Sequence, residues 1–484
     1  MQGGLFMQDS ILVFCQSNHQ AGLIARTLRY REFRCTPVAC GTSAADAAAM
    51  NPRGLIIAGE TGDSLEWLDH ELLTLNVPVL ALGGAAAALC AHFGGSRAPA
   101  QDNPGFVTLS LENDPLFAEI SSGERMMSAP DALSLSDVLS PIASASGQVI
   151  GFRHNVLPLY AMQYPIERND PDGAQMLSNF ASICGMSEEW NDETLITRAV
   201  ERIRRAAPEG RVLCAVSGGV DSAVCAKLTS MAVGDRLLCV FVDTGMFRQN
   251  EPENVINTFM DSMGLVVAHV DAHDFFLRAL SGISAPRDKE RIAGQLMNQM
   301  LIKQLAFDPG IKTVITGTNF NDVFFSGATP NSSVPGDVVI CEPVRDLFKE
   351  EVRRLATALK LPASITERQP FPASGLALRV FGSLTEKRLQ LLRAADACFT
   401  QEICAEGYDR RLWQYYATLI DSPDVPGSHA VCLRATQSSR GGAYAARMPF
   451  DLLERTAERI RQEVPGITRI VYDLTPSAHY SELE

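Results

Sequence analysis

Continuous apolar runs alternate with helix-like stretches through the first part of the chain. The runs at 11–14, 54–59 and 77–83 do not alternate with polar residues, as expected for strands buried on both faces, and residues 20–30 carry a helical pattern. Short buried strands separated by helices predict a parallel sheet with helices on both faces. A new helix is expected after a linker, because the Asn-Asp-Glu at 191–193 supplies a cap and two acids.

The same pattern repeats between residues 191 and 372. The expected elements are strands at 212–216, 237–242 and 314–318, with a helix through 223–228. These elements predict a second α/β domain with a parallel sheet of its own.

The rest of the chain, residues 373–484, has a mixed pattern. Helix-like stretches at 386–400 and 450–463 alternate with strand-like stretches at 430–435 and 469–474. This order is typical of an α+β module. A chain of 484 residues is long enough for three domains that each bury a core.

Composition and charge narrow the classes of function. No apolar run reaches the roughly 18–20 residues of a membrane span, and the N-terminus has no basic region of the secretory kind. The formal charge is −14 without a long basic run, which argues against a nucleic-acid partner. The twelve cysteines are scattered without metal-ligand spacing, so we expect reduced thiols and a cytoplasmic protein.

A phosphate-binding loop is expected where the strand at 212–216 ends in Ser-Gly-Gly-Val-Asp-Ser, residues 217–222. Glycines let the backbone approach an anion closely, and the loop amides and the N-terminus of the next helix direct partial positive charge at it. Asp221 adds a carboxylate suited to holding the Mg²⁺ that neutralises a pyrophosphate leaving group. The loop has no Walker lysine, so it is not of the kinase type.

This loop matches that of the N-type ATP pyrophosphatases, and other stretches resemble GMP synthases in particular. They lie at 241–251, 342–353, 368–377 and 463–473. The resemblance implies three domains: a class I glutamine amidotransferase-like domain at 1–190, an ATP pyrophosphatase domain of the Rossmann-like adenine-nucleotide alpha-hydrolase type at 191–372, and an α+β dimerisation domain at 373–484.

The family's reaction and residues are expected to follow. In that family ATP transfers AMP to the 2-oxygen of xanthosine monophosphate, and ammonia drawn from glutamine displaces AMP to give GMP. The resemblance implies a homodimer, ATP and Mg²⁺ as cofactors, Asp221 and Ser222 as catalytic residues and Asp221 as the metal ligand. The implied ATP-binding residues are Ser217, Gly218, Gly219, Val220, Asp221, Ser222, Val242, Asp243 and Gly317. The residues expected to bind the acceptor substrate are Asp322, Arg434 and Glu482.

The amidotransferase half departs from the family. Its catalysis needs a nucleophilic Cys on a tight strand-to-helix turn, activated by a His that a Glu orients. The family's Gly-Ile-Cys-Tyr-Gly-Met-Gln aligns with residues 83–89, which puts Ala85 at the nucleophile's position. The His-Pro-Glu motif keeps Glu167 but has Pro165 in place of the His. We therefore expect a domain that cannot hydrolyse glutamine, and an ammonia source elsewhere.

The acceptor side departs as well. The family's Lys-Ser-His-His-Asn falls near 329–333, its Gly-Thr-Tyr-Pro-Asp becomes 317–322 with only Asp322 kept, and its C-terminal Lys-Pro-Pro becomes Pro-Ser-Ala at 476–478. Losing two lysines removes charge-assisted contacts of the strongest kind. We expect xanthosine monophosphate to be a poor substrate.

Three functions are left open by these departures. One is a GMP-synthase-type ligase that uses free ammonia or ammonia from a separate glutaminase. Another is a paralogue that activates a different carbonyl for ammonia, another amine or a sulfur donor, in a specialised pathway. The third is a regulatory pseudoenzyme that binds ATP without catalysis. A tRNA-modifying pyrophosphatase is disfavoured by the acidic charge and the absence of a cysteine set.

Overall fold

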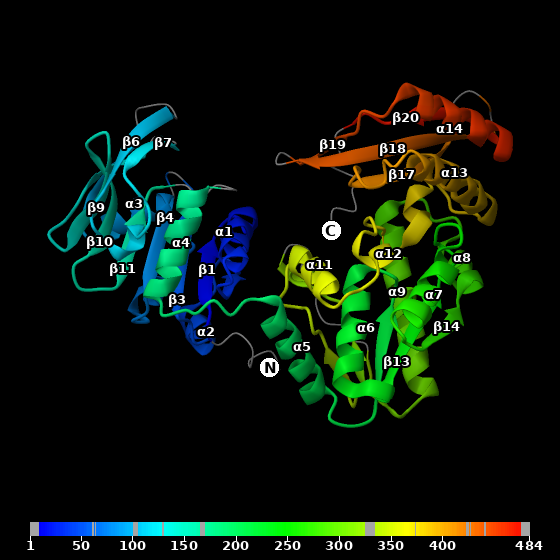
Figure 1. Cartoon of the computed structure of the whole chain (residues 1–484), viewed down its shortest axis with the longest axis horizontal. Coiled ribbons are helices and arrows are strands. Elements are labelled where there is room, and N and C mark those ends of the chain that lie inside the picture. Colours follow the sequence, from blue (N-terminus) through cyan, green and yellow to red (C-terminus); the bar gives the residue numbers. More distant parts are fainter. Residues whose placement is uncertain are drawn as a thin grey trace. The chain divides into compact units, whose positions relative to one another are not determined.

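The computed structural model describes residues 9–60, 62, 64–99, 105–127, 130–164, 170–324, 334–372, 374–422, 425, 427–439 and 442–475. The chain divides into two compact units, Met1–Leu195 and Ile196–Glu484 (Figure 1). One hydrophobic core contains residues from both sides of the expected boundary between the second and third domains, at 372 and 373. A division of the chain at this boundary therefore stays a prediction.

Unit 1 is built on a nine-stranded sheet of order β2-β1-β3-β4-β11-β10-β9-β6-β7. Its strands are β1 Ile11–Cys15, β2 Cys35–Val38, β3 Gly54–Gly59, β4 Val79–Gly83, β6 Gly105–Leu111, β7 Gly123–Met127, β9 Leu139–Ala145, β10 Gln148–His154 and β11 Leu159–Met162. A small second sheet pairs β5 Ser96–Ala98 with β8 Ala132–Ser134.

The expectation of a parallel sheet holds for only half of this sheet. Strands β2-β1-β3-β4-β11 are parallel, whereas β11-β10-β9-β6-β7 are antiparallel. The pairing changes from parallel to antiparallel between β11 and β10. Within the antiparallel half, β9 and β10 form a hairpin in which Ser146 and Gly147 both have positive φ, as a two-residue primed turn requires. We did not anticipate this turn from the sequence.

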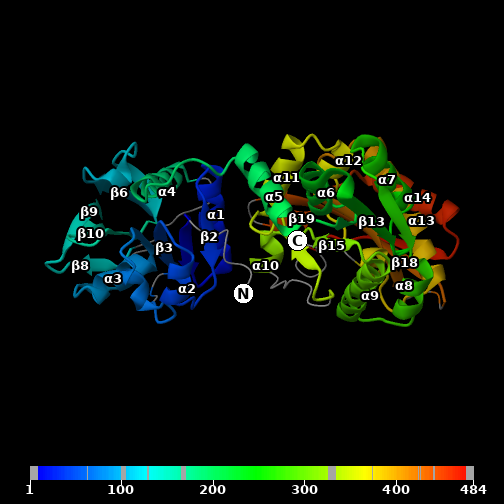
Figure 2. The same ribbon diagram turned by 90° about the horizontal axis from the view of Figure 1, so that it is seen from below.

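Helices cover both faces of the sheet in unit 1, as expected. Figure 2 shows α1 and α4 on one face, and α2 and α3 on the other. Helix α1 begins after Ser17, whose hydroxyl accepts a hydrogen bond from the Gln20 amide, and it buries one apolar stripe. The helices are α1 Asn18–Tyr30, α2 Ala44–Ala49, η1 His70–Thr74, α3 Gly84–His92, η2 Pro115–Phe117 and α4 Pro171–Ile183.

Unit 2 begins within α5 (Asp192–Ala206) and contains a five-stranded parallel sheet of order β14-β13-β12-β15-β16. The strands are β12 Arg211–Val216, β13 Leu237–Asp243, β14 Val267–Asp271, β15 Ile311–Ile315 and β16 Val339–Cys341. The third expected strand, 314–318, is placed too late: it ends at Ile315, and residues 316–318 form a loop at the carboxyl edge of the sheet.

Helices lie between the strands of this sheet along the chain (Figure 1). They are α6 Val220–Val233, η3 Gly234–Arg236, α7 Glu251–Asn257, η4 Thr258–Ser262, α8 His273–Leu280, α9 Pro286–Phe307, α10 Phe320–Phe324, α11 Lys349–Ala358 and α12 Ala363–Thr366.

The C-terminal part of unit 2 is a small mixed sheet with two helices. Strands β17 Gln414–Asp421, β18 His429–Ser439 and β19 Gly442–Ala445 are antiparallel, and β20 Ile467–Tyr472 joins β18 in parallel. Helices α13 Glu386–Ala405 and α14 Phe450–Glu463 pack together against this sheet, and η5 Gly375–Arg379 leads into it. The helix-strand pattern expected after residue 372 is therefore confirmed.

No helix in the described part of the chain is both long and apolar enough to cross a membrane.

Candidate functional site

The phosphate loop lies where β12 ends, and it leads directly into α6. Gly218 has φ +77°, and a Cβ there would come within 2.4 Å of Val255 Cγ2, so the position requires glycine. The buried hydroxyl of Ser222 accepts from the Ser217 amide at 3.2 Å and donates to the Gly219 carbonyl at 2.9 Å. Ser222, which we expected to be catalytic, stabilises the conformation of the loop through these two hydrogen bonds.

Gly317 brings the end of a neighbouring strand against the same helix terminus. It follows β15, and a Cβ there would lie 3.2 Å from both Asp221 Cβ and the Ser222 amide nitrogen. A larger residue would push the loop after β15 away from α6. This position, expected to bind ATP, therefore keeps two backbone segments close together at the phosphate loop.

Asp221 lies in the first turn of α6 and forms an ion pair with Lys349. Asn319 Nδ2 lies 3.5 Å from its other carboxylate oxygen. Lys349 is the first residue of α11, from a distant part of the chain. It supplies at this site the cation that the loop itself lacks. The stretch 342–353 resembles the family in sequence, but the pattern by itself assigns no role to Lys349.

Lys349 is held in place by the segment that contains Asp322. The Lys349 amide donates to Asn321 Oδ1 at 3.0 Å, and the Asn319 side-chain oxygen accepts from the amides of Asn321 and Asp322. Asp322 in turn accepts from the Asn319 amide at 2.9 Å. The structure thus ties Asp322, expected to contact the acceptor, into the network that positions Lys349. A contact with substrate stays a prediction.

Val242 and Asp243 lie at the end of β13, the strand next to the loop. Val242 is buried in the hydrophobic core, so its side chain is not presented to a ligand. Asp243 accepts a hydrogen bond from the Gly245 amide at 2.8 Å, and its other oxygen lies 3.7 Å from His269 Nε2. Its carboxylate remains partly accessible, with 21% exposure.

Arg434, the expected acceptor-binding residue on β18, is buried and already engaged. Its guanidinium donates to Asp473 Oδ2 at 2.8 Å and to the Thr475 carbonyl at 2.9 Å. These hydrogen bonds hold the segment that follows β20 to Arg434 on β18. The other calls at Glu482, Pro165, Glu167, 329–333 and 476–484 fall outside the described residues.

In unit 1 the tight strand-to-helix turn is at Gly83, two residues before the expected Ala85. Gly83 has φ +62° and ψ −131°, and a Cβ there would come within 2.6 Å of the Gly59 carbonyl oxygen. Ala85 lies in the first turn of α3 and is completely buried. The position assigned to the nucleophile is thus corrected from Ala85 to Gly83, because a nucleophile elbow needs this strained turn. Both residues lack a nucleophilic atom.

Cys90, the nearest thiol along α3, is also unsuited to replace a nucleophile. Its sulfur is buried and lies 3.7 Å from the Ser134 carbonyl oxygen. Burial raises the pKa of the Cys90 thiol, which disfavours the reactive thiolate.

Two family models and relatives of nearly the same length match this chain. Residues 194–380 match the family model for NAD synthase, and residues 401–479 match the model for the GMP synthase C terminal domain. GMP synthase (glutamine-hydrolyzing) of Sulfurimonas denitrificans is 36% identical, with 96% of this chain and 97% of the relative covered. The proteins of the same name from Carboxydothermus hydrogenoformans and Bacillus cytotoxicus are each 33% identical, over 97% and 96% of this chain and 98% and 97% of the relatives.

Proposed function

The chain belongs to the GMP synthase family, and we propose that it is an AMP-forming ligase that activates a purine-nucleotide carbonyl with ATP for attack by ammonia. The observation that carries the proposal is the pairing of Asp221 with Lys349 at the N-terminus of α6. The similarity over nearly the full length favours xanthosine monophosphate as the acceptor over the paralogue and pseudoenzyme alternatives.

The residues around the loop fit ATP and a metal ion. Gly218 lets the loop turn tightly beside Val255, the N-terminus of α6 favours an anion, and Asp221 is one carboxylate of the kind that binds Mg²⁺ together with phosphate oxygens. A bound Mg²⁺ would neutralise charge on the departing pyrophosphate. Lys349 would turn from Asp221 to the phosphates once the metal occupies that carboxylate.

Ammonia, rather than glutamine, is the nitrogen donor that fits unit 1. Gly83 has no side chain, and the Gly59 carbonyl oxygen lies 2.6 Å from the position that a nucleophile's Cβ would take. Ammonia would come from solution or from a separate glutaminase. We also propose that the chain forms a homodimer through residues 373–484 and works in the cytoplasm.

The test is GMP formation from xanthosine monophosphate, ATP and Mg²⁺, with ammonium or with glutamine as donor. Ammonium should support turnover and glutamine should not. Asp221→Ala should abolish pyrophosphate release, whereas Asp235→Ala, in the short helix η3 that follows α6, should not change it because Asp235 is exposed. Glutamine-dependent turnover by the purified chain, or full activity of Asp221→Ala, would contradict the proposal.

A further inference from the structure

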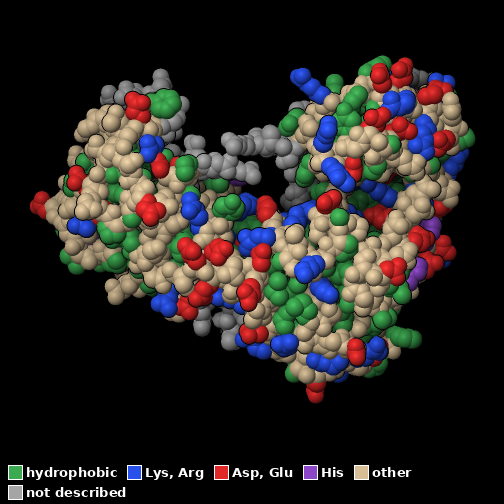
Figure 3. Space-filling view, in the orientation of Figure 1, with side chains coloured by type: hydrophobic (Ala, Val, Ile, Leu, Met, Phe, Trp, Pro, Cys, Tyr) green, Lys and Arg blue, Asp and Glu red, His purple; other side chains and the backbone are tan. Residues whose placement is uncertain are grey.

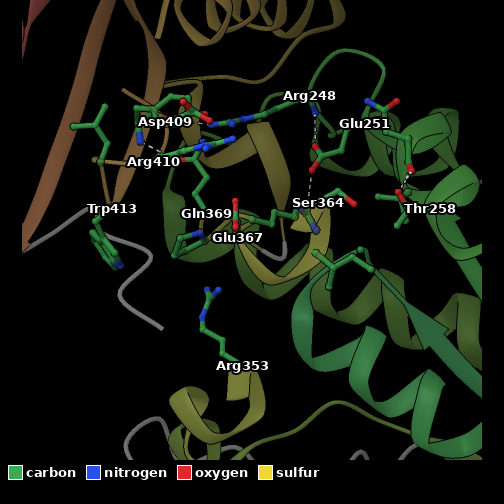
Figure 4. Close-up of a pocket in the computed structure, with 18 of the residues that line it drawn as sticks. Arg248, Glu251, Thr258, Arg353, Ser364, Glu367, Gln369, Asp409, Arg410 and Trp413 are labelled. Carbon is green, nitrogen blue, oxygen red and sulfur yellow. Dashed lines mark hydrogen bonds and ion pairs between the residues drawn. The ribbon is translucent and has the colours of Figure 1, made fainter. Parts of the chain in front are cut away.

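Three charged side chains contact one another along the wall of a cavity beside the phosphate loop (Figure 4). The cavity measures about 750 Å³, and its lining includes Arg248, Glu251 and Arg368 together with Gly218 of the loop. Figure 3 shows Lys and Arg side chains beside Asp and Glu side chains along this hollow. Because positive and negative groups compensate one another on this wall, its effect on the loop depends on where the pairs hold the backbone.

Arg368 contacts the first peptide group of the phosphate loop. Its Nη1 donates to the Ser217 carbonyl oxygen at 3.3 Å. The C=O and N–H of a trans peptide group point in opposite directions, so this bond directs the Gly218 amide away from Arg368. Gly218 is buried, and its amide donates to no described residue. The Gly218 amide is therefore left for a phosphate oxygen as long as Arg368 stays on the Ser217 carbonyl.

Glu251, the first residue of α7, holds Arg368 in that position. One of its carboxylate oxygens forms an ion pair with Arg368 Nη2, and the other accepts a hydrogen bond from the Arg248 amide at 2.9 Å, as Figure 4 shows. The side chains of Glu251 and Arg368 are 13% and 19% exposed, so water competes little for this charge-assisted pair. One turn along α7, Val255 lies against Gly218, so the same helix also limits the position of the loop there.

The C-terminal part of unit 2 anchors this arrangement through Arg248. Its Nε pairs with Asp396 Oδ2 at 3.1 Å, and its Nη2 donates to the Tyr415 carbonyl oxygen at 2.9 Å. Asp396 lies on α13 with its side chain 2% exposed, and its other carboxylate oxygen accepts from the Ala417 amide of β17 at 2.9 Å. Because α13 and β17 pack together, the Arg248 amide that Glu251 contacts has a fixed place.

We propose that Glu251 is a positioning residue for the phosphate loop, which holds Arg368 on the Ser217 carbonyl and thereby presents the Gly218 amide to ATP. The choice of ATP as the ligand rests on the proposed function. The position of the loop in the free chain rests only on the contacts of Glu251, Arg368 and Ser217.

The first experiment measures ATP binding to the full chain with Mg²⁺ by calorimetry. Glu251→Ala should raise the Kd of ATP about tenfold or more, because the hydrogen bond from the Gly218 amide to a charged phosphate is lost. Glu253→Ala removes the same charge from an exposed position of the same helix and should bind ATP normally. In turnover, Glu251→Ala should raise the KM of ATP and leave kcat within about twofold, whereas a loss of stability alone would leave KM unchanged.

A double variant shows whether Glu251 acts through Arg368. Arg368→Met should weaken ATP binding to a similar extent, and adding Glu251→Ala should weaken it little further, because both changes release the same carbonyl. Effects that add would overturn the proposal. A lower Kd in Glu251→Ala, caused by a released Arg368 that pairs with ATP, would overturn it too.

Hydrogen exchange of the chain without ATP separates this proposal from the proposed function. The Ser217 amide donates to Ser222 Oγ at 3.2 Å, so its exchange reports the opening of the loop. The loop should exchange faster in Glu251→Ala than in the wild type or in Glu253→Ala. Unchanged exchange would overturn the positioning role. Faster exchange in a chain that forms no GMP would refute the proposed function and leave the positioning role standing.

Discussion

At the scale of single residues, the phosphate loop is paired with a cation, Lys349, that lies far from it in the sequence. The loop at 217–222 has glycines and a carboxylate but no lysine of its own, and Lys349 fills that role by packing against Asp221. The sequence pattern predicted the loop because strand, glycines and helix are local features. It could not predict the pairing, because the contact exists only once α11 lies beside α6.

Lys349→Met should lower pyrophosphate release by about 10²-fold, the usual effect of removing one stabilising group from a transition state. The change keeps the length of the side chain, so the fold should remain intact. Lys303→Met, on the exposed side of α9, is the control and should leave the rate unchanged. Steady-state rates with saturating ATP are the measurement. A normal rate in the Lys349→Met enzyme would show that Lys349 does not take part in the reaction.

Gly83 gives a second residue-scale prediction. Gly83→Cys should not create glutaminase activity, because the new Cβ would meet the Gly59 carbonyl at 2.6 Å. Gly83→Ala should also destabilise the chain more than Gly185→Ala does. Gly185 has a similar φ of +66° but nothing within 4 Å of its Cβ position, so it reports backbone strain alone, about 1–2 kcal/mol. Equal midpoints for the two variants in denaturant unfolding would show that the contact costs nothing.

At the scale of elements, one buried lysine joins α9 to the segment that leads into the C-terminal sheet. Lys289 Nζ donates to the carbonyls of Ala377, Val380 and Gly382 at 2.6 to 3.1 Å. Its side chain is almost fully buried. These bonds fix η5 against α9 and help to explain why the expected second and third domains share one core.

The pH dependence of stability tests this link. Burial, with a smaller effect of Arg388, lowers the pKa of Lys289 to about 8 from 10.5 in the unfolded chain. Between these values the unfolded state binds more protons, so the contribution of Lys289 to stability should increase as pH rises from 8 to 10.5. The measurement is the free energy of unfolding of the wild type minus that of Lys289→Met across this range. A difference that is flat or falls with pH would refute the assignment.

Some helices, strands and turns have no sequence pattern from which they could be predicted. The strands and helices that the sequence pattern predicts are those in which a buried strand or an amphipathic helix leaves its own periodicity. The sequence pattern predicts none of the strands β6, β7, β9 and β10 of the antiparallel half of the first sheet, nor the two-residue turn at Ser146 and Gly147 that joins β9 to β10. The elbow was misplaced from Gly83 to Ala85 because residues 85–88 are all alanine, so neither size nor polarity fixes the register.

At the scale of the whole molecule, the described residues include a phosphate loop in which Asp221 pairs with Lys349, and a strained strand-to-helix turn at Gly83, which has no side chain. The acceptor-binding residues that the family resemblance implies near 329–333 and at 476–484 lie outside the described residues. Arg434 does not replace the family's lysine in any described contact, because its guanidinium is used by Asp473 and Thr475. We therefore expect the nucleotide phosphate to meet fewer cations here than the family sequence provides.

The last prediction concerns xanthosine monophosphate. The chain has Pro476 where the family has a lysine that reaches the monophosphate, and a hydrogen bond to a charged group is worth about 1.5–3 kcal/mol. Its KM for xanthosine monophosphate should therefore be about tenfold to a hundredfold higher than that of the Sulfurimonas denitrificans relative. Pro476→Lys should lower KM with little change in kcat, because the contact acts on ground state and transition state alike. A wild-type efficiency within tenfold of the relative, or a KM unaffected by Pro476→Lys, would show that other residues bind the phosphate.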